Sequence, residues 1–363
     1  MTSSFDIRMV ENGSQMSHNS QPEIPRSDSH FPGRRTKIIE VMFACAGVIL
    51  PSASGYKIYV LRFLGIALQL SNIVCTIWSL LAPRGDADDK GVTLVRGIMY
   101  ESLTLLIMIT PLALLHSIVR VPKFYAMFLE AMKNSDDLHF WDFALPLLPV
   151  ALIGIASSVE QSTDPLPNIT LSVLNVIGNV TGNYTTAIGI VVISLLTRKF
   201  ARDFDELNFK NVNEPLQNVV QSYNSETREW TNLLNTIFLV PMFFLWLLYL
   251  MIQLFFFIDG VTNASILEVL VDVIWTSGAS IMLCTLLVPA AEFTSRNNRR
   301  TYDKITELSK NHTNLASIVW LNMTSFGWRI LSIEISNTIL LGIIYFLVSG
   351  ILLIMSRFIT ISR

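Results

Sequence analysis

Three of the carboxylates inside long apolar stretches of the sequence, where acids are unusual, are candidates for a functional role. Glu101 lies in one stretch, and Glu268 and Asp272 lie four residues apart in another. A four-residue spacing puts two side chains on one face of a helix. A charge inside a bilayer costs free energy, so it is usually functional or paired. Two interpretations stay open: a ligand pocket or cation-attracting vestibule, or a headgroup-level Glu268 beside an Asp272 that accepts hydrogen bonds from a neighbouring helix.

A second polar pattern is a row of asparagines in another apolar stretch. Asn175, Asn179 and Asn183 recur every four residues, with Gly178 and Gly182 beside them. Small residues let two membrane helices approach closely, and asparagines hydrogen-bond across the seam between them. The row therefore predicts either the wall of a ligand cavity or a close-packed seam.

Aromatic side chains accompany these polar rows. Tyr100, Tyr184, Trp246, Tyr249 and Trp275 all lie within apolar stretches. Together with the acids and asparagines they are compatible with a mostly apolar cavity that carries few polar groups, as small-molecule sites do. An aromatic residue in a membrane helix also serves packing, or anchors the helix at the interface. We therefore predict a small-molecule ligand site from these residues, with packing as the alternative for each aromatic.

The sequence offers no set of residues suited to catalysis or metal binding. Among its five histidines, His116 and His139 lie near the ends of two apolar stretches, with no third histidine or cysteine at ligand spacing. The sequence contains no nucleophile elbow, Walker loop, CxxC pair or HExxH. Its three cysteines are too few for a disulfide framework. We expect no enzyme activity, no cofactor and no bound metal.

The composition indicates which elements position these residues. The chain has 363 residues, of which 51% are hydrophobic and only 15% charged, whereas soluble domains are about 25% charged. The mean hydropathy is +0.49. The net charge of −2 leaves no basic domain for a nucleic-acid partner. The sequence therefore predicts an all-α protein whose main surroundings are the lipid bilayer.

Seven apolar blocks are long enough to cross about 30 Å of hydrocarbon at about 1.5 Å per residue. They are expected at residues 58–82, 94–119, 142–161, 171–197, 234–258, 265–290 and 334–358. Seven transmembrane helices follow, the first four within 58–197, the next two within 234–290 and the last at 334–358.

The segments outside the seven apolar blocks are predicted to be a tail, an interfacial helix and a cytoplasmic helical base. Residues 1–36 are rich in Ser, Asn and Pro, which predicts a disordered cytoplasmic tail. Residues 37–57 hold an apolar run that is too short to span, so we expect an interfacial or re-entrant helix there. Apolar residues recur at helical spacing in 198–233 and in 291–333. These two segments predict an extended helical base in the cytoplasm.

Lysines and arginines orient the chain. With a cytoplasmic N-terminus, 21 of the 26 basic residues lie on the cytoplasmic side, as the positive-inside rule requires. We therefore predict a multi-pass plasma-membrane protein with an extracellular C-terminus. This layout disfavours a G-protein-coupled receptor, whose N-terminus is outside. Two sequons, at Asn168 and Asn263, fall on the external side and are candidates for glycosylation.

Two stretches of the second half carry a family resemblance. Residues 229–238 read Glu-Trp-Thr-Asn-Leu-Leu-Asn-Thr-Ile-Phe before an aromatic-rich span, and residues 326–340 begin Phe-Gly-Trp-Arg before the last span. With seven spans and an internal N-terminus, the chain resembles the insect chemoreceptor superfamily, most closely an invertebrate gustatory receptor. Gly350-Ile351 and Arg357-Phe358 stand where that family has Thr-Tyr and Gln-Phe. The departure indicates a divergent, gustatory-receptor-like member.

The resemblance implies a function. Members of this superfamily are ligand-gated cation channels for chemoreception, built as tetramers of one or of several related subunits, and the last span lines the pore. The pore candidates implied here are Asn337, Ile344, Val348, Ile351 and Met355. Apolar residues in such a place would close the pore by dewetting. The alternatives are that this span simply faces lipid and protein, and that the chain is a non-channel membrane protein such as a solute transporter.

Overall fold

The structure is a computed structural model, and it describes residues 34–51, 55–81, 90–133, 138–163, 169–206, 225, 227–260, 266–309, 328–331 and 333–361. The sequons at Asn168 and Asn263 and nearly all of the expected tail lie outside these residues. So do the side chains of Tyr100, Glu101, Glu268, Ile351 and Met355, although their backbones belong to described helices.

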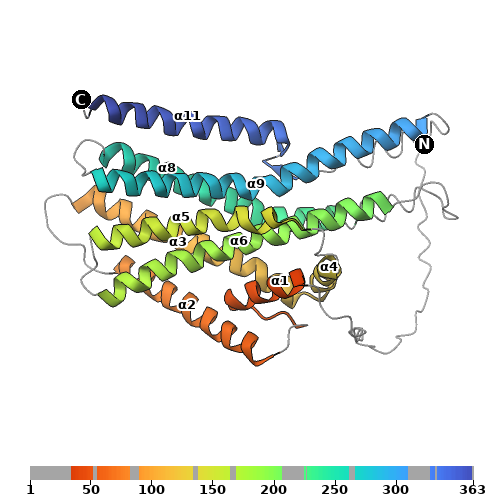
Figure 1. Ribbon diagram of the computed structural model, residues 1–363, viewed down its shortest axis with the longest axis horizontal. Coiled ribbons are helices and arrows are strands. Elements are labelled where there is room, and N and C mark those ends of the chain that lie inside the picture. Colours follow the sequence, from red (N-terminus) through yellow and green to blue (C-terminus); the bar gives the residue numbers. More distant parts are fainter. Residues whose placement is uncertain are drawn as a thin grey trace, which may run out of the picture. The chain divides into compact units, whose positions relative to one another are not determined.

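Helices make up almost all of the described chain (Figure 1). They are α1 (Arg34–Cys45), α2 (Tyr56–Leu81), α3 (Lys90–Arg120), α4 (Pro122–Lys133), α5 (Phe140–Thr163), α6 (Ile169–Glu206), the π-helix η2 (Asn235–Leu239), α8 (Val240–Gly260), α9 (Ile266–Ser309) and α11 (Asn337–Ile361). Two strands of two residues each, β1 (Arg329–Ile330) and β2 (Ile333–Glu334), pair antiparallel just before α11. The predicted all-α fold class is confirmed.

Seven of these helices match the predicted spans. Within the described residues, six helical segments, in α2, α3, α5, α6, η2–α8 and α9, are long and apolar enough to cross a membrane. The seventh, α11, has 25 residues, which at about 1.5 Å per residue exceeds the hydrocarbon thickness of about 30 Å. The chain is therefore a multi-pass membrane protein.

Helix α6 is the centre of the bundle. It packs against α2, α3, α4, α5 and α9, and Figure 1 shows it running between these neighbours. The predicted glycine seam explains the close approach. A Cβ at Gly178 would lie 2.1 Å from Asn72 Oδ1, and a Cβ at Gly182 would lie 2.6 Å from Met108 Cγ. Only a residue without a side chain lets α2 and α3 come this near.

Several boundaries differ from those expected. α9 runs unbroken to Ser309, so the span expected to end at residue 290 and the first part of the helical segment expected after it form one helix. The sequence predicts part of the helical base at 291–333. The first part of this segment belongs to the end of α9, and its last part forms the β1–β2 pair. Residues 310–327 lie outside the described part. The last span begins at Asn337 rather than at residue 334, because residues 333–334 form β2.

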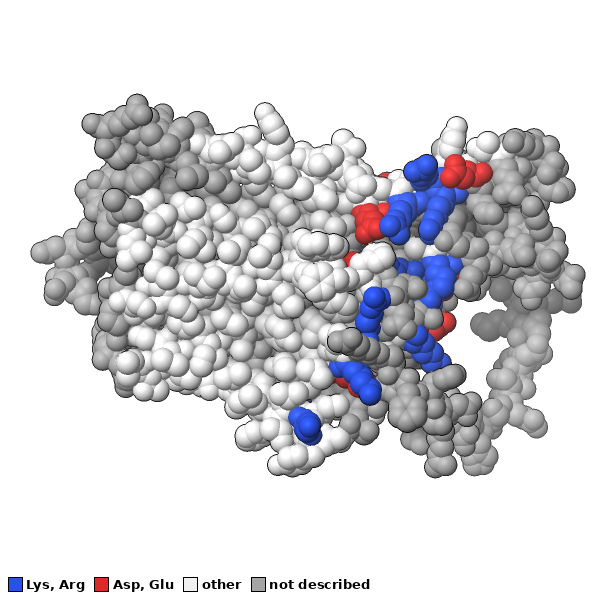
Figure 2. All heavy atoms as spheres, in the orientation of Figure 1, with Lys and Arg blue, Asp and Glu red and all other residues white. Residues whose placement is uncertain are grey.

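Charged residues gather at one end of the bundle. Figure 2 shows the visible lysines and arginines in a band beside a wide area that, among the described residues on this face, is free of charge. The band lies where α1, α4 and the C-terminal parts of α6 and α9 are found in Figure 1. This end carries the basic residues that the positive-inside rule assigns to the cytoplasm. The orientation itself stays a prediction.

Candidate functional site

A hollow opens between α3, α6 and α8, with about 300 Å³ of space free of atoms. We call it the asparagine hollow. Its wall consists of Thr104, Ile107 and Met108 of α3, Gly178, Asn179, Gly182 and Asn183 of α6, and Trp246 and Tyr249 of α8. Four of the predicted ligand-site residues therefore meet here, namely Asn179, Asn183, Trp246 and Tyr249.

Two buried polar atoms in this wall lack hydrogen-bond partners. Asn183 Nδ2 donates to the Asn179 carbonyl at 2.6 Å, but Asn183 Oδ1 contacts no donor in the described part of the chain. Trp246 is only 1% exposed, and its Nε1 likewise finds no acceptor among the described residues. A buried polar group left without a partner costs about 1–3 kcal/mol. A molecule in the hollow that offers one donor and one acceptor would remove both costs.

Hydrogen bonds from neighbouring helices hold the polar side of the hollow. Asn72 Nδ2 on α2 donates to the Gly178 carbonyl at 2.7 Å and contacts Met108 Sδ at 2.8 Å. Asn179 Nδ2 donates to Ser157 Oγ on α5 at 3.0 Å. These contacts join α6 to α2 and α5, and α2 to α3, around the hollow. The sequence reasoning missed Asn72, although an asparagine inside the first apolar block was a visible signal.

An aromatic row leads away from the hollow. The rings of Trp246 and Tyr249 lie 5.3 Å apart between centroids, and those of Tyr249 and Trp275 lie 6.2 Å apart. Trp275 Nε1 donates to Glu160 Oε2 on α5 at 3.2 Å. Trp275 therefore stands behind the wall rather than in it. Glu160 is a further intramembrane acid that the sequence analysis did not single out.

The other predicted ligand-site residues lie elsewhere. The hydroxyl of Tyr184 points to α1, where it donates to the Met42 carbonyl at 3.4 Å. Asn175 and Asp272 are half-buried on α6 and α9 and do not line the asparagine hollow. Their roles as ligand contacts stay predictions.

Helix α11 packs along α9 and is joined to it at its start. Asn337 is exposed, and its N–H donates to Ser295 Oγ at 3.2 Å. Asn298 Nδ2 donates to Glu334 Oε1 at 2.7 Å, just before the helix. These contacts fix the end of α11 that lies nearest the basic end of α9.

The two faces of α11 differ in burial. Leu340 and Leu347 are buried, and Ile344 packs against the core of the bundle. Val348 is 50% exposed, and the side chains that share its face are Leu341, Tyr345 and Leu352, all more exposed than Val348. The predicted pore residues Ile344 and Val348 therefore differ in their surroundings, although they are only four positions apart.

The described residues contain no group of three His, Cys, Asp or Glu side chains with the geometry to hold a metal ion. The polar groups of the asparagine hollow are amides, hydroxyls and an indole. Such groups bind by hydrogen bonding, which suits a neutral organic molecule.

No family model and no curated protein sequence matches this chain. Among solved structures, it is similar to the insect olfactory receptor OR5 from Machilis hrabei, determined in complex with eugenol. The TM-score is 0.53 at 7% sequence identity, and the match covers 89% of this chain and 97% of the receptor chain. At this identity the likeness establishes a shared fold.

Proposed function

We propose that this chain is a gustatory-receptor-like chemoreceptor that works as a ligand-gated cation channel and not as an enzyme. It acts in the plasma membrane with its N-terminus in the cytoplasm. Its fold is that of an insect olfactory receptor over nearly the whole chain. The observation that carries the proposal is the asparagine hollow, a small cavity within this fold whose wall holds one unpaired acceptor and one unpaired donor.

The lining of the hollow supports a proposal for the class of ligand. The hollow's space of about 300 Å³ includes open solvent at the mouth, so the enclosed part is smaller than a typical small-molecule site of about 300–1,000 Å³. No ionisable side chain except the phenol of Tyr249 lines it, so a charged ligand would be desolvated without a counter-charge. The expected ligand is a small, neutral, mostly apolar molecule that donates one hydrogen bond to Asn183 Oδ1 and accepts one from Trp246 Nε1. The similar receptor was determined with eugenol bound, which is consistent with a small organic ligand.

The pore is assigned to α11. Leu341, Tyr345, Val348 and Leu352 follow one another at spacings of four, three and four residues, and all are at least half exposed. This spacing puts them in one apolar stripe along the helix. In a tetramer of this chain, alone or with related subunits, four such stripes surround a central axis. An apolar ring there excludes ions until ligand binding widens it.

Whole-cell recording in a heterologous cell tests the ligand site. A panel of small neutral alcohols, phenols and ketones is screened first for inward current. Trp246→Phe removes the unpaired donor, and we expect it to raise the half-maximal ligand concentration at least fivefold, the equivalent of about 1 kcal/mol for one hydrogen bond. Trp78→Phe, at an exposed position on α2 that lines neither hollow, is the matched control. If both variants respond to the ligand at the same half-maximal concentration, the asparagine hollow is not the ligand site.

Serine substitutions test the pore. Val348→Ser puts a hydroxyl in the exposed stripe and should wet the constriction, which produces cation current without ligand. Ile344→Ser faces the core of the bundle and should not. Ile351→Ser and Met355→Ser extend the scan toward the end of the helix. If all four variants reach the surface and none conducts without ligand, α11 does not gate a pore, and a transporter-like role becomes the better account.

A further inference from the structure

A second hollow lies at the basic end of the bundle, between α5, α6 and α9, and about 540 Å³ of its space is free of atoms when the open solvent at its mouth is included. We call it the arginine crevice. Its lining includes Trp141, Leu145 and Pro146 of α5, Thr197 and Arg198 of α6, and Val288, Pro289, Glu292 and Arg296 of α9. One part of the lining is apolar and the other is charged, so the crevice is amphipathic.

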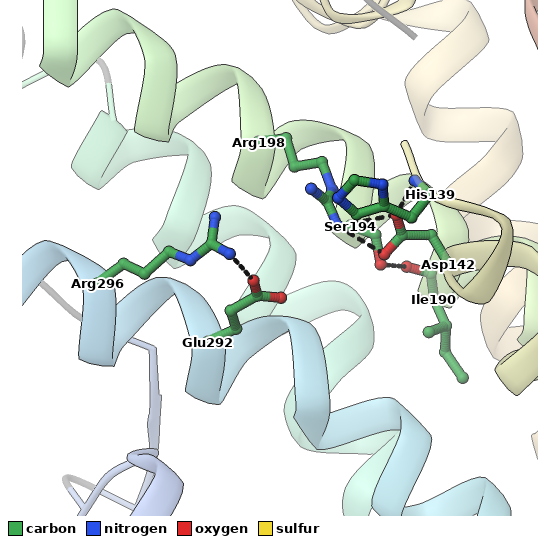
Figure 3. A network of polar contacts seen from close by, with 7 residues as sticks. All are labelled: His139, Asp142, Ile190, Ser194, Arg198, Glu292 and Arg296. Atoms are coloured by element: carbon green, nitrogen blue, oxygen red, sulfur yellow. Dashed lines mark hydrogen bonds and ion pairs between the residues drawn. The ribbon is translucent and has the colours of Figure 1, made fainter. Parts of the chain in front are cut away.

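Two ion pairs border the charged part, as Figure 3 shows. Arg198 Nη2 on α6 lies 2.8 Å from Asp142 Oδ2 on α5, and the His139 N–H donates to the same oxygen at 2.6 Å. Arg296 Nη2 lies 2.5 Å from Glu292 Oε1, one turn away on α9. The first pair is mostly buried and the second is more than one-third exposed. The exposed pair is therefore the one that a ligand can separate at little cost.

One hydroxyl in the crevice lacks a partner. Ser194 Oγ donates to the Ile190 carbonyl at 3.1 Å, and Thr285 Oγ1 donates to the Met282 carbonyl at 3.0 Å. Thr197 is only 6% exposed, yet its Oγ1 has no hydrogen-bond partner in the part of the chain that the structure describes. A buried hydroxyl of this kind indicates a missing acceptor.

The position of the crevice in the bundle is the one expected at headgroup depth. Its arginines belong to the end of the bundle where basic residues gather, next to the uncharged area of Figure 2. Trp141 in its rim is 64% exposed, and an exposed tryptophan beside an apolar helix face is typical of the membrane interface. On this placement we expect the apolar wall to face acyl chains and the charged wall to face headgroups.

We propose that the arginine crevice binds one phospholipid whose headgroup carries a primary ammonium. Its phosphate takes the hydrogen bond of Thr197 Oγ1 and pairs with Arg296, its ammonium donates to Glu292, and an acyl chain lies along Trp141 and Leu145. Two arginines and two carboxylates make the crevice neutral overall, so a headgroup with both charges fits better than a purely anionic one. The proposal needs only the membrane placement of the bundle and is independent of the channel function.

Native mass spectrometry and thermal unfolding of the purified full chain in neutral detergent test this proposal. The probes are phosphatidylethanolamine, phosphatidylcholine, phosphatidylglycerol, glycerophosphoethanolamine and inorganic phosphate. Phosphatidylethanolamine should bind at least tenfold tighter than the other four and raise the unfolding temperature. Phosphatidylcholine has no ammonium hydrogen, phosphatidylglycerol has no ammonium, and the two water-soluble probes have no acyl chain.

Two variants and a control complete the test. Thr197→Val keeps the shape but removes the hydroxyl, and it should weaken phosphatidylethanolamine binding about tenfold while the lipid-free protein unfolds at an equal or higher temperature. Arg296→Gln should weaken binding to a similar extent. Arg299 is an exposed arginine on the same helix outside the crevice, so Arg299→Gln should bind phosphatidylethanolamine with the affinity of the unmodified chain.

Three results would overturn the proposal. The first is equal phosphatidylethanolamine affinity in Thr197→Val, Arg296→Gln and Arg299→Gln. The second is binding of glycerophosphoethanolamine or inorganic phosphate as tight as that of the lipid, which would make the crevice a site for soluble phosphates. The third is binding of phosphatidylglycerol as tight as that of phosphatidylethanolamine, which would leave Glu292 without a role.

Discussion

The contact between α2 and α6 can be tested by a single methyl group. A Cβ added at Gly178 would lie 2.1 Å from Asn72 Oδ1 and 2.4 Å from Asn72 Cγ. Asn72 is buried, and its Nδ2 holds the Gly178 carbonyl at 2.7 Å. The amide therefore has to break this hydrogen bond to make room. Gly178→Ala should separate the two helices or force Asn72 into another rotamer.

The expected cost follows from three terms. Overpacking a close contact costs about 1–3 kcal/mol, and the lost hydrogen bond adds about 1 kcal/mol. Replacement of glycine by alanine inside a helix returns about 1 kcal/mol. Gly178→Ala should therefore destabilise the protein by about 1–3 kcal/mol. Gly342→Ala on α11 is the control, because no described atom lies within 4 Å of its added Cβ, so it should be neutral or slightly stabilising.

The unfolding temperature of each detergent-solubilised variant measures the change in stability. Size-exclusion chromatography after heating gives the fraction of protein that is still folded. Gly178→Ala should unfold at a lower temperature than Gly342→Ala. The double variant Asn72→Ala with Gly178→Ala removes the colliding amide, so the alanine at 178 should cost less there than in the unmodified background. An equal cost in both backgrounds, or a Gly178→Ala variant as stable as Gly342→Ala, would refute the packing argument.

Three further predictions concern topology and charge. A tag at Met1 should be cytoplasmic and one at Arg363 extracellular, so antibody access to the first tag in intact cells would reverse the orientation. Asp272→Asn should alter ligand response or permeation, because it removes an intramembrane charge; normal surface level, sensitivity and selectivity would make this acid structural. Burial raises the pKa of the Glu40 carboxyl in α1, against the opposing effect of Lys37. Above the raised pKa the Glu40 carboxylate is charged in the folded protein, and its burial lowers the free energy of unfolding. This loss of stability disappears as the pH falls through the raised pKa and the carboxyl group takes up a proton. Glu40→Gln should therefore raise the unfolding temperature at pH 8 but not at acidic pH, and an equal effect at both would show that its charge is irrelevant.

Hydropathy predicted the number and nature of the helices better than their ends. An apolar block of more than 20 residues marks the part of a helix inside the bilayer, whereas the backbone continues as long as its own hydrogen bonds do. Hydropathy places the end of a span at residue 290, and α9 continues from there to Ser309, as the helical spacing of apolar residues in 291–333 allowed. Hydropathy alone does not mark α4, because its 12 residues are too few to cross the bilayer.

The asparagine hollow was only partly predictable, because spacing assigns residues to a helix face but does not reveal what that face meets. Asn179 and Asn183 share the hollow with Trp246, as the sequence allowed. Tyr184 follows Asn183 directly and points to α1 instead, since adjacent positions on a helix lie about 100° apart. Asn72 is more than 100 positions from Gly178 along the chain. Its role depends on tertiary packing that no local pattern contains.

In α11, residue spacing alone does not show which side chains face the bundle, and the exposure of each side chain is needed as well. Positions four apart on a helix differ by about 40°, so a pair such as Ile344 and Val348 can straddle the edge of a packed face. Ile344 contacts the core, whereas Val348 is half exposed beside Tyr345 and Leu352. The two residues therefore belong to different faces, and only Val348 lies in the stripe that a symmetric assembly would bring to its axis. A current without ligand from Val348→Ser alone would confirm that distinction, and a current from Ile344→Ser alone would place the axis toward the side of α11 that packs against the bundle.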